Sequence, residues 1–176
     1  MPCKRNGFSL IEVMVSLVIL VIGLIGIFNL HIISKQGSFE SFQQTQASYY
    51  ANDMINRMRL NSAQLAQYAN GSPYSGTPSA VSQRCDSATV FCSASQMALW
   101  DIFEWQSSFI GTSEVINTKN VGGLDTATGC INVNGNVVTV TMSWKAIRSS
   151  SDSGDVNACG TASDKRRIYS IQTVII

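Results

Sequence analysis

The pattern of apolar and polar positions begins with a long apolar run. Residues 8–33 are almost all apolar, and Glu12 is the only formally charged side chain among them. A helix over this run would be about 39 Å long at roughly 1.5 Å per residue, enough to cross a hydrocarbon layer of about 30 Å with some tilt. An unpaired carboxylate in lipid is costly, so Glu12 requires a partner charge.

Residues 34–68 contain no proline, and their apolar side chains recur at helical spacing. This stripe consists of Phe39, Phe42, Tyr49, Tyr50, Met54, Met58, Leu60 and Leu65. We therefore expect one helix from about Ser9 to Tyr68, with the stripe packed under a globular region. Asp53 and Arg57 interrupt the stripe at i,i+4 spacing, which favours an ion pair at its boundary.

Turn-forming residues dominate 69–84 and predict an exposed connection. Ser93 and Gln96 then have capping-box spacing, which indicates the start of a short helix. We expect this helix to end near Phe109, with Gly111 as its stop signal and 111–129 as a further loop.

Alternation of apolar and polar residues predicts strands in the last third of the chain. The first strand is 131–133, and Asn134-Gly135 predicts the tight turn of a hairpin whose second strand covers 136–146. Its apolar side comprises Val138, Val140, Met142 and Trp144, and its polar side, expected to face water, comprises Thr139, Thr141, Ser143 and Lys145. A last strand covers 167–176, with Tyr169, Ile171, Thr173 and Ile175 on one side.

A short basic leader precedes the apolar run. It reads Met1-Pro2-Cys3-Lys4-Arg5-Asn6-Gly7 and is followed by Phe8-Ser9-Leu10-Ile11-Glu12-Val13. This motif resembles the class III signal of type IV prepilins and pseudopilins, in which a prepilin peptidase cuts after the glycine and N-methylates the new Phe. The resemblance implies that Gly7 ends the leader, that Phe8 is the N-methylated mature terminus and that Glu12 is the assembly glutamate. The new amino group would lie about 6 Å along the helix axis from Glu12, a suitable counter-charge.

The apolar run continues with Gly23 and Gly26 late in its length, and in this respect it looks most like the PilV group of minor pilins. The resemblance implies an α+β fold, the pilin-like ladle, in which a long N-terminal helix has a transmembrane half and an amphipathic half that packs on a small antiparallel β-sheet. The expected parts are a cleaved leader (1–7), a transmembrane or filament-core helix (8–33), its amphipathic continuation (34–68) and a globular extracytoplasmic head (69–176).

A secretory signal or a plain membrane anchor is the alternative interpretation of the apolar run. A secretory signal has an apolar core of about 7 to 15 residues and a small-residue cleavage site, and residues 30–35 offer no such site. A plain anchor explains the length but neither Gly7-Phe8 nor Glu12. Lys4 and Arg5 before the run predict a cytoplasmic N-terminus and an exported head.

Five cysteines are present, and Cys3 lies in the leader. In an exported domain the other four indicate two disulfides, for which three pairings are possible. We favour Cys85 with Cys92, a local pair, and Cys130 with Cys159, which would tie two neighbouring β segments. Zinc is the competing interpretation, but the spacing fits no zinc ribbon and the only histidine, His31, lies in the apolar helix.

No catalytic constellation is evident, and we expect neither enzyme activity nor a small-molecule substrate, cofactor or metal. Asp101 and Glu104 are i,i+3 neighbours that could act as paired carboxylates, but a solvated helix face is favoured. Trp100, Phe103 and Trp105 are expected in the core rather than on a ligand platform. A short helix needs such side chains to hold it onto a sheet.

Charge argues against a polyanion partner. The formal net charge is +1, and removal of Lys4 and Arg5 leaves 10 basic against 11 acidic side chains. The only basic run, Lys165-Arg166-Arg167, is short and follows Asp164. We therefore favour solvent-exposed residues at the start of the last strand over a DNA contact.

The resemblance implies a PilV-like minor pilin that takes part in initiating type IV pilus assembly and sits at the pilus tip, supporting piliation, twitching and adhesion. Its implied partners are prepilin peptidase, other minor pilins, the major pilin and the inner membrane, with the assembled pilus outside the cell as its final location. A minor pseudopilin of a type II secretion system and a DNA-binding pilin for DNA uptake are the alternatives.

Overall fold

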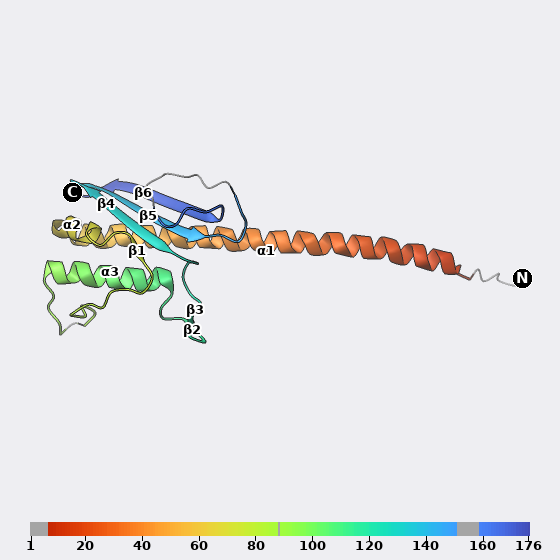
Figure 1. Ribbon diagram of the computed structural model, residues 1–176, viewed down its shortest axis with the longest axis horizontal. Helices are drawn as coiled ribbons and strands as arrows, with labels where there is room; N and C mark the ends of the chain where they lie inside the picture. The colour runs from red at the N-terminus through yellow and green to blue at the C-terminus, as the bar shows by residue number, and fades with distance from the viewer. Residues whose placement is uncertain (1–6, 88, 151–158) are drawn as a thin grey trace, which may run out of the picture. The chain divides into compact units, whose positions relative to one another are not determined.

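The computed structural model describes residues 7–87, 89–150 and 159–176. The chain divides into two compact units, Met1–Phe39 and Glu40–Ile176. Helix α1 (Leu10–Leu60) begins in the first unit and contributes its last part, from Glu40 onward, to the second unit, which we call the head (Figure 1). The predicted long N-terminal helix and small antiparallel sheet are confirmed, so the fold is α+β.

The helix ends earlier than predicted. A continuous helix to Tyr68 is wrong, because Asn61 leaves the helical conformation (φ −131°, ψ 46°) and a 3₁₀ turn (Ser62–Gln64) and the short helix α2 (Leu65–Ala69) follow. The side-chain amide of Asn61 donates to the Tyr68 hydroxyl (3.3 Å) and to the Ala94 carbonyl oxygen (2.8 Å). Asparagine side chains compete with helical backbone hydrogen bonds in this way, and the chain turns here.

The head contains a four-stranded antiparallel sheet in the order β1-β4-β5-β6. Its strands are β1 (Tyr74–Ser75), β4 (Thr128–Asn134), β5 (Val137–Lys145) and β6 (Arg166–Val174). The predicted β4–β5 hairpin is confirmed, but the pairing of Asn134 with Val137 makes Gly135-Asn136 its two-residue turn. Gly135 has φ 59°, a conformation that glycine adopts without a steric cost.

Helix α3 (Ala94–Ile110) is the predicted short helix. The capping box is present, with Ser93 accepting from the Gln96 backbone N–H and Gln96 accepting from that of Ser93. Gly111 ends the helix in the left-handed conformation at φ 73°. The region after it, expected to be a loop, contains a small hairpin of β2 (Val115–Ile116) and β3 (Lys119–Asn120).

The core lies between the head part of α1, α3 and one face of the sheet. Trp105 of α3 is fully buried, and its indole N–H donates to the Tyr50 carbonyl oxygen at 2.8 Å. Its ring lies so close to Gly129 on β4 that a Cβ at this position would overlap it. The absence of a side chain at Gly129 therefore allows α3 to approach the sheet.

The buried face of α1 differs from the predicted stripe. It consists of Gln43, Ala47, Tyr50, Ala51, Met54, Ile55 and Met58. Phe39, Phe42, Tyr49 and Leu60, which the stripe included, are exposed. The two buried alanines have small side chains that allow neighbouring elements to approach α1 closely, so the packed face includes residues that hydrophobicity alone does not select.

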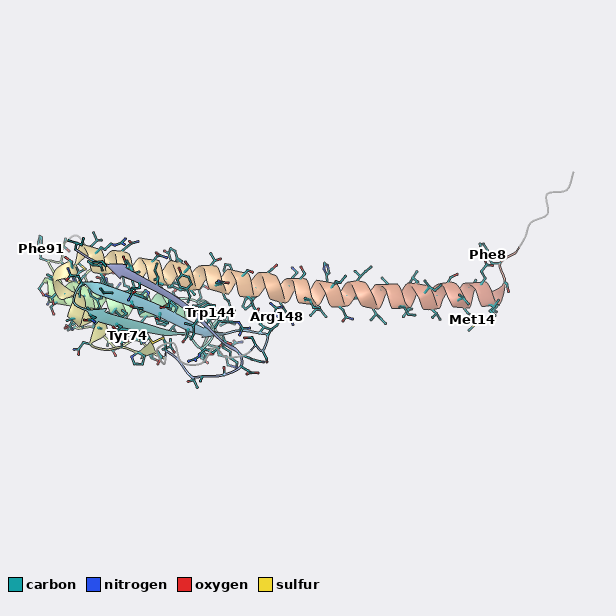
Figure 2. The ribbon with its side chains drawn as sticks, turned by 90° about the horizontal axis from the view of Figure 1, so that it is seen from above. Phe8, Met14, Tyr74, Phe91, Trp144 and Arg148 are labelled. Carbon is teal, nitrogen blue, oxygen red and sulfur yellow. A yellow bond between two sulfur atoms is a disulfide. The ribbon has the colours of Figure 1, made fainter. Side chains whose placement is uncertain are left out.

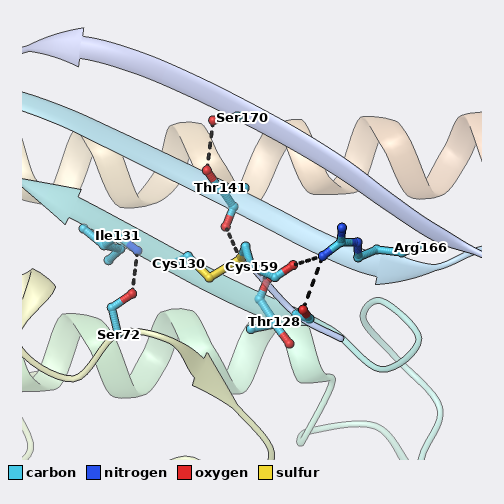
Figure 3. Close-up of a disulfide and its surroundings, with 9 residues drawn as sticks. Ser72, Thr128, Cys130, Ile131, Thr141, Cys159, Arg166 and Ser170 are labelled. Atoms are coloured by element: carbon cyan, nitrogen blue, oxygen red, sulfur yellow. Dashed lines mark hydrogen bonds between the residues drawn. A yellow bond between two sulfur atoms is a disulfide. The ribbon is translucent and has the colours of Figure 1, made fainter. Parts of the chain in front are cut away.

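The polar side of β5 is also not simply exposed to water. Thr141 and Ser143 are each only 2% exposed. The segment with Cys159 and Gly160 covers them, and Cys159 Sγ lies 3.5 Å from the Thr141 carbonyl oxygen (Figure 3). Thr141 also shares a 2.9 Å hydrogen bond with Ser170 of β6, so its hydroxyl is satisfied without water.

Candidate assembly site

The predicted cleavage position lies in front of α1. Gly7 and Phe8 are exposed, and a Cβ on Gly7 would meet nothing within 4 Å. Figure 2 shows Phe8 and Met14 at the beginning of α1. The rest of the predicted leader, residues 1–6 with Lys4 and Arg5, lies outside the described residues. The backbone around Gly7 is thus open to an enzyme that requires close approach.

Glu12 lies in the first turn of α1. The Ser9 carbonyl oxygen accepts the backbone N–H of Glu12 (3.0 Å) and of Val13 (3.3 Å), which closes this turn. The Glu12 side chain is exposed, and among the described residues no hydrogen bond or ion pair of its carboxylate is found. A negative charge is favourable at a helix N-terminus. The carboxylate is therefore positioned and available to a positive group from elsewhere.

The apolar side chains that follow Glu12 are exposed all around the helix. From Leu10 to Ile33 the large apolar residues have exposed fractions between 43% (Val21) and 78% (Leu10). In the described part of the chain, α1 is the one helix that is long and apolar enough to cross a membrane. So much apolar surface requires lipid or other apolar helices around it.

A cluster of charges joins α1 to α3 inside the head. The predicted Asp53–Arg57 ion pair is confirmed at 3.0 Å, and the same guanidinium donates to Asp101 (3.1 Å) and to Glu104 (2.9 Å). The expectation of a solvated face is therefore wrong for Asp101, whose side chain is 11% exposed, whereas the Glu104 side chain contacts Arg57 and is still 38% exposed. Burial alone would lower the pKa of Arg57, but its hydrogen bonds to the carboxylates outweigh burial and raise it above the ordinary value.

Tyr68 completes this cluster from α2. It is fully buried, and its hydroxyl donates to Asp101 Oδ2 at 2.6 Å. Burial, followed by this hydrogen bond to a carboxylate, raises the pKa of Tyr68. Asp101 is thus held by two donors that are distant in the sequence, and sequence spacing contained no signal for either contact. The arrangement connects α1, α2 and α3 and stabilises the head.

A second ion pair connects the start of the head part of α1 to the loop after β5. The guanidinium of Arg148 donates to Glu40 Oε2 at 2.7 and 3.2 Å, and the Arg148 backbone N–H donates to Oε1 at 2.9 Å. These contacts, of which the side-chain hydrogen bond is the largest cause, lower the pKa of Glu40. Sequence analysis did not identify this pair, because the two residues are 108 positions apart.

Among the described residues the structure contains two disulfides, Cys85–Cys92 and Cys130–Cys159. They are the same pairs that the sequence analysis favoured. Cys130–Cys159 joins β4 to the segment that covers β5 (Figure 3). In the described residues no group of three or more His, Cys, Asp or Glu side chains is arranged to hold a metal ion.

The basic run at 165–167 does not form one exposed cluster. Arg166 is buried, and its guanidinium donates to the carbonyl oxygens of Cys159 and Gly160 at 3.3 and 3.4 Å. Arg167 donates to the Arg148 carbonyl oxygen at 2.9 Å and to the Ser150 hydroxyl at 2.7 Å. Both guanidinium groups thus take part in holding loops of the head.

Two models of known protein families match parts of this chain. Residues 30–103 match the family model described as Type IV pilin Tt1218, and residues 2–28 match that of the prokaryotic N-terminal methylation motif. No curated protein and no solved structure matches the chain. The matches, together with a long helix packed on a small antiparallel sheet, support a type IV pilin.

The match to the Type IV pilin Tt1218 model ends at residue 103, and residues 104–176 lie outside both matches. Type IV pilins are structural proteins, so the expectation that the chain is not an enzyme is confirmed. The resemblance to the PilV group stays a prediction.

Proposed function

We propose that this protein is a minor pilin, similar to the PilV group, that helps to initiate type IV pilus assembly. The observation that carries the proposal is the first turn of α1, where the single carboxylate of Glu12 lies at the start of an otherwise apolar, exposed helix. The match to the N-terminal methylation motif supports processing in front of this turn.

In this proposal prepilin peptidase cleaves after Gly7 and methylates Phe8. Cleavage creates an amino group in the same turn region as Glu12, in an environment that penalises either charge alone. Pairing of the Glu12 carboxylate with the Phe8 amino group of the same or an adjacent subunit would then favour the correct axial position of neighbouring helices during assembly. Apolar packing supplies the attraction between the helices, and the charge pair selects the register.

The remaining parts follow from the same proposal. The segment 8–33 anchors the chain in the inner membrane with a cytoplasmic N-terminus and later enters the filament core. The segment 34–68 continues this helix, with the break that begins at Asn61. The segment 69–176 forms the exported body of the head. Other minor pilins and the major pilin are the partners. The position is at the pilus tip, where the protein supports piliation, twitching and adhesion.

Two other functions use the same N-terminal chemistry. A minor pseudopilin of a type II secretion system would be processed and anchored in the same way. A DNA-binding pilin would require a basic surface, and the contacts of Arg166 and Arg167 with backbone oxygens reduce the charge that this run presents.

A gene deletion distinguishes the three functions when surface pili, secreted enzymes and DNA uptake are scored in the same strain. We expect fewer surface pili and less twitching, restored by wild-type protein and by a chain with Lys165→Gln. The chain that also carries Arg166→Gln and Arg167→Gln is compared only after its fold has been checked, because both guanidinium groups hold loops of the head. A secretion defect with normal pili would establish the pseudopilin function, and salt-sensitive DNA binding that these variants abolish would establish DNA uptake.

A further inference from the structure

A pocket of about 510 Å³ lies between one face of α3 and the segment 67–82, which runs from α2 through β1. Its volume is in the range of about 300 to 1,000 Å³ that is usual for small-molecule sites. One wall consists of α3 residues at helical spacing, which places them on one face of that helix. They are Leu99, Ile102, Phe103 and Gln106. None of the described residues that line the pocket is Asp, Glu, Lys, Arg or His.

Gln106 supplies a fixed hydrogen-bond acceptor in this pocket. The residue is only 5% exposed, and its side-chain amide nitrogen donates to the carbonyl oxygens of Ser75 (3.1 Å) and Gly76 (3.3 Å). Because a carbonyl oxygen can only accept, these two contacts fix which end of the amide is the nitrogen. The amide oxygen has no hydrogen-bond partner among the described residues. An acceptor on a nearly buried side chain favours a ligand that presents an N–H or O–H donor to it.

An apolar surface precedes this acceptor on the same face of α3. Ile102 and Phe103 lie one helical turn before Gln106, and Leu99 lies one turn further back. The ring of Phe103 is partly buried and stacks on Trp100, with 5.4 Å between the ring centroids and 29° between the ring planes. Its position is thus held before a ligand binds, which reduces the entropy lost on binding. The wall therefore offers an acceptor and an apolar patch within two helical turns.

The opposite wall is rich in hydroxyl groups. Four exposed side chains of the segment 75–82 that carry a hydroxyl line the pocket, namely Ser75, Thr77, Ser79 and Ser82. Serine and threonine hydroxyls both donate and accept hydrogen bonds. They therefore match a ligand that carries several hydroxyl groups of its own.

The contacts of Gln106 also select against an extended peptide as the ligand. β1 is an edge strand of the four-stranded sheet, and a peptide that added to this edge would bond to its outward backbone groups. The amide nitrogen of Gln106 already bonds to the carbonyl oxygens of Ser75, the last residue of β1, and of Gly76. Because these acceptors are taken, recognition in the pocket is left to side chains.

We propose that this pocket binds a neutral saccharide that carries an N-acetyl group. The acetamido group has an N–H that donates to the Gln106 amide oxygen and a methyl group that packs on the apolar part of the α3 wall. The sugar hydroxyls bond to the serine and threonine side chains of the opposite wall. This inference goes beyond the proposed role in pilus assembly and requires only the head.

Titration of the purified full-length chain with chitotriose, the trimer of N-acetylglucosamine, tests the proposal. The detergent has no sugar headgroup, and cellotriose, a glucose trimer without acetamido groups, is the matched control ligand. We expect chitotriose to bind about tenfold more tightly, because it alone offers the N–H and the methyl group. In saturation-transfer NMR the acetamido methyl protons should receive the largest share of the saturation. Equal affinity for the two trimers, or saturation that spares the methyl protons, would overturn the inference.

A substitution that fills the pocket provides the second measurement. Ala80 is exposed and lines the pocket, whereas Ala63 is exposed and lies outside it. We expect Ala80→Trp to weaken chitotriose binding about tenfold, because the indole occupies the space of the ligand, and Ala63→Trp to leave binding unchanged. Both chains should unfold at the temperature of the wild type. The inference fails if chitotriose does not bind, if Ala80→Trp binds it as wild type does, or if Ala63→Trp weakens binding equally.

Insoluble probes distinguish two sources of the saccharide. Chitin presents N-acetylated sugars outside the cell, and peptidoglycan presents them in the cell wall. Retention of the chain on chitin beads identifies the first source, and retention on purified peptidoglycan sacculi identifies the second. In either case Ala80→Trp should reduce the retained fraction, and retention on neither material would contradict the proposal. Piliation of the deletion strain involves no saccharide, so failure of the assembly function and failure of this inference are separate results.

Discussion

The Tyr68 hydroxyl donates to Asp101 Oδ2 at 2.6 Å, across 33 positions of the sequence. The other oxygen of the same carboxylate accepts from Arg57 at 3.1 Å. One nearly buried carboxylate therefore connects α1, α2 and α3, and it does so at the place where the chain turns after Leu60.

Replacement of Tyr68 by Phe removes one donor to this carboxylate and keeps the ring. We expect the free energy of unfolding to fall by about 1 to 3 kcal/mol, because Asp101 stays buried with one hydrogen bond fewer. Denaturant unfolding of the detergent-solubilised chain measures this loss. Tyr49→Phe is the matched control, since Tyr49 is 68% exposed. Equal effects of the two substitutions would contradict the role of this hydrogen bond.

The Glu40–Arg148 pair predicts a pH dependence of head stability. Arg148 lowers the pKa of Glu40 in the folded state, so the pair contributes stability above the unfolded pKa of about 4.3. That contribution disappears as the pH falls from about 4.3 through the lower pKa of the folded state. Glu40→Gln should make the unfolding midpoint less dependent on pH in this range, and Glu114→Gln, at an exposed position, should not. The prediction is wrong if wild type and Glu40→Gln lose stability in parallel.

The two disulfides should differ in their effect on stability. On the chain-entropy account, closing loops of about 30 and 8 residues contributes roughly 3.6 and 2.5 kcal/mol. We expect Cys130→Ser with Cys159→Ser to lower the unfolding temperature more than Cys85→Ser with Cys92→Ser, because Cys159 also covers β5. Non-reducing peptide mapping of the exported protein should recover both pairs. Free thiols or bound zinc in that protein would contradict the disulfide assignment.

Processing predicts the mass of the mature protein. Intact-mass analysis should give a chain that begins at Phe8 and carries one methyl group. Gly7→Leu should leave the unprocessed chain in the inner membrane, because a side chain at this position prevents close approach of the peptidase. Gly37→Ala, at a glycine inside α1, serves as the control. A mature chain with another first residue would refute the cleavage site, and an unmethylated Phe8 would refute the methylation.

Glu12→Gln tests the proposed charge pair. The variant keeps the size of the side chain and removes its charge, so insertion and cleavage should be normal. Association with other pilins should be lost, because the Phe8 amino group would have no counter-charge in an apolar environment. Co-purification from detergent extracts measures it, with Ser16→Ala as the control one turn away. If Glu12→Gln retains its partners as well as wild type does, the pairing is wrong.

Local pattern sufficed for the long elements, but it did not predict α2, β1 or the β2–β3 hairpin. The apolar run predicted the helix that can cross a membrane, the Ser93–Gln96 spacing predicted the start of α3, and alternation predicted β5 and β6. These features depend on backbone geometry and on neighbours within a few positions, which are visible in the sequence. The cleavage motif and Glu12 are likewise local, and for that reason the candidate assembly site could be proposed before the fold was known.

Tertiary structure alone decided which surfaces these elements bury. Asp101 was expected to be exposed to solvent, but it lies against Arg57 and Tyr68. Thr141 was also expected to be exposed to solvent, but the segment that contains Cys159 covers it. Burial and charge pairing depend on which distant residue arrives opposite each side chain, and the spacing of residues along a single element contains no information about that partner.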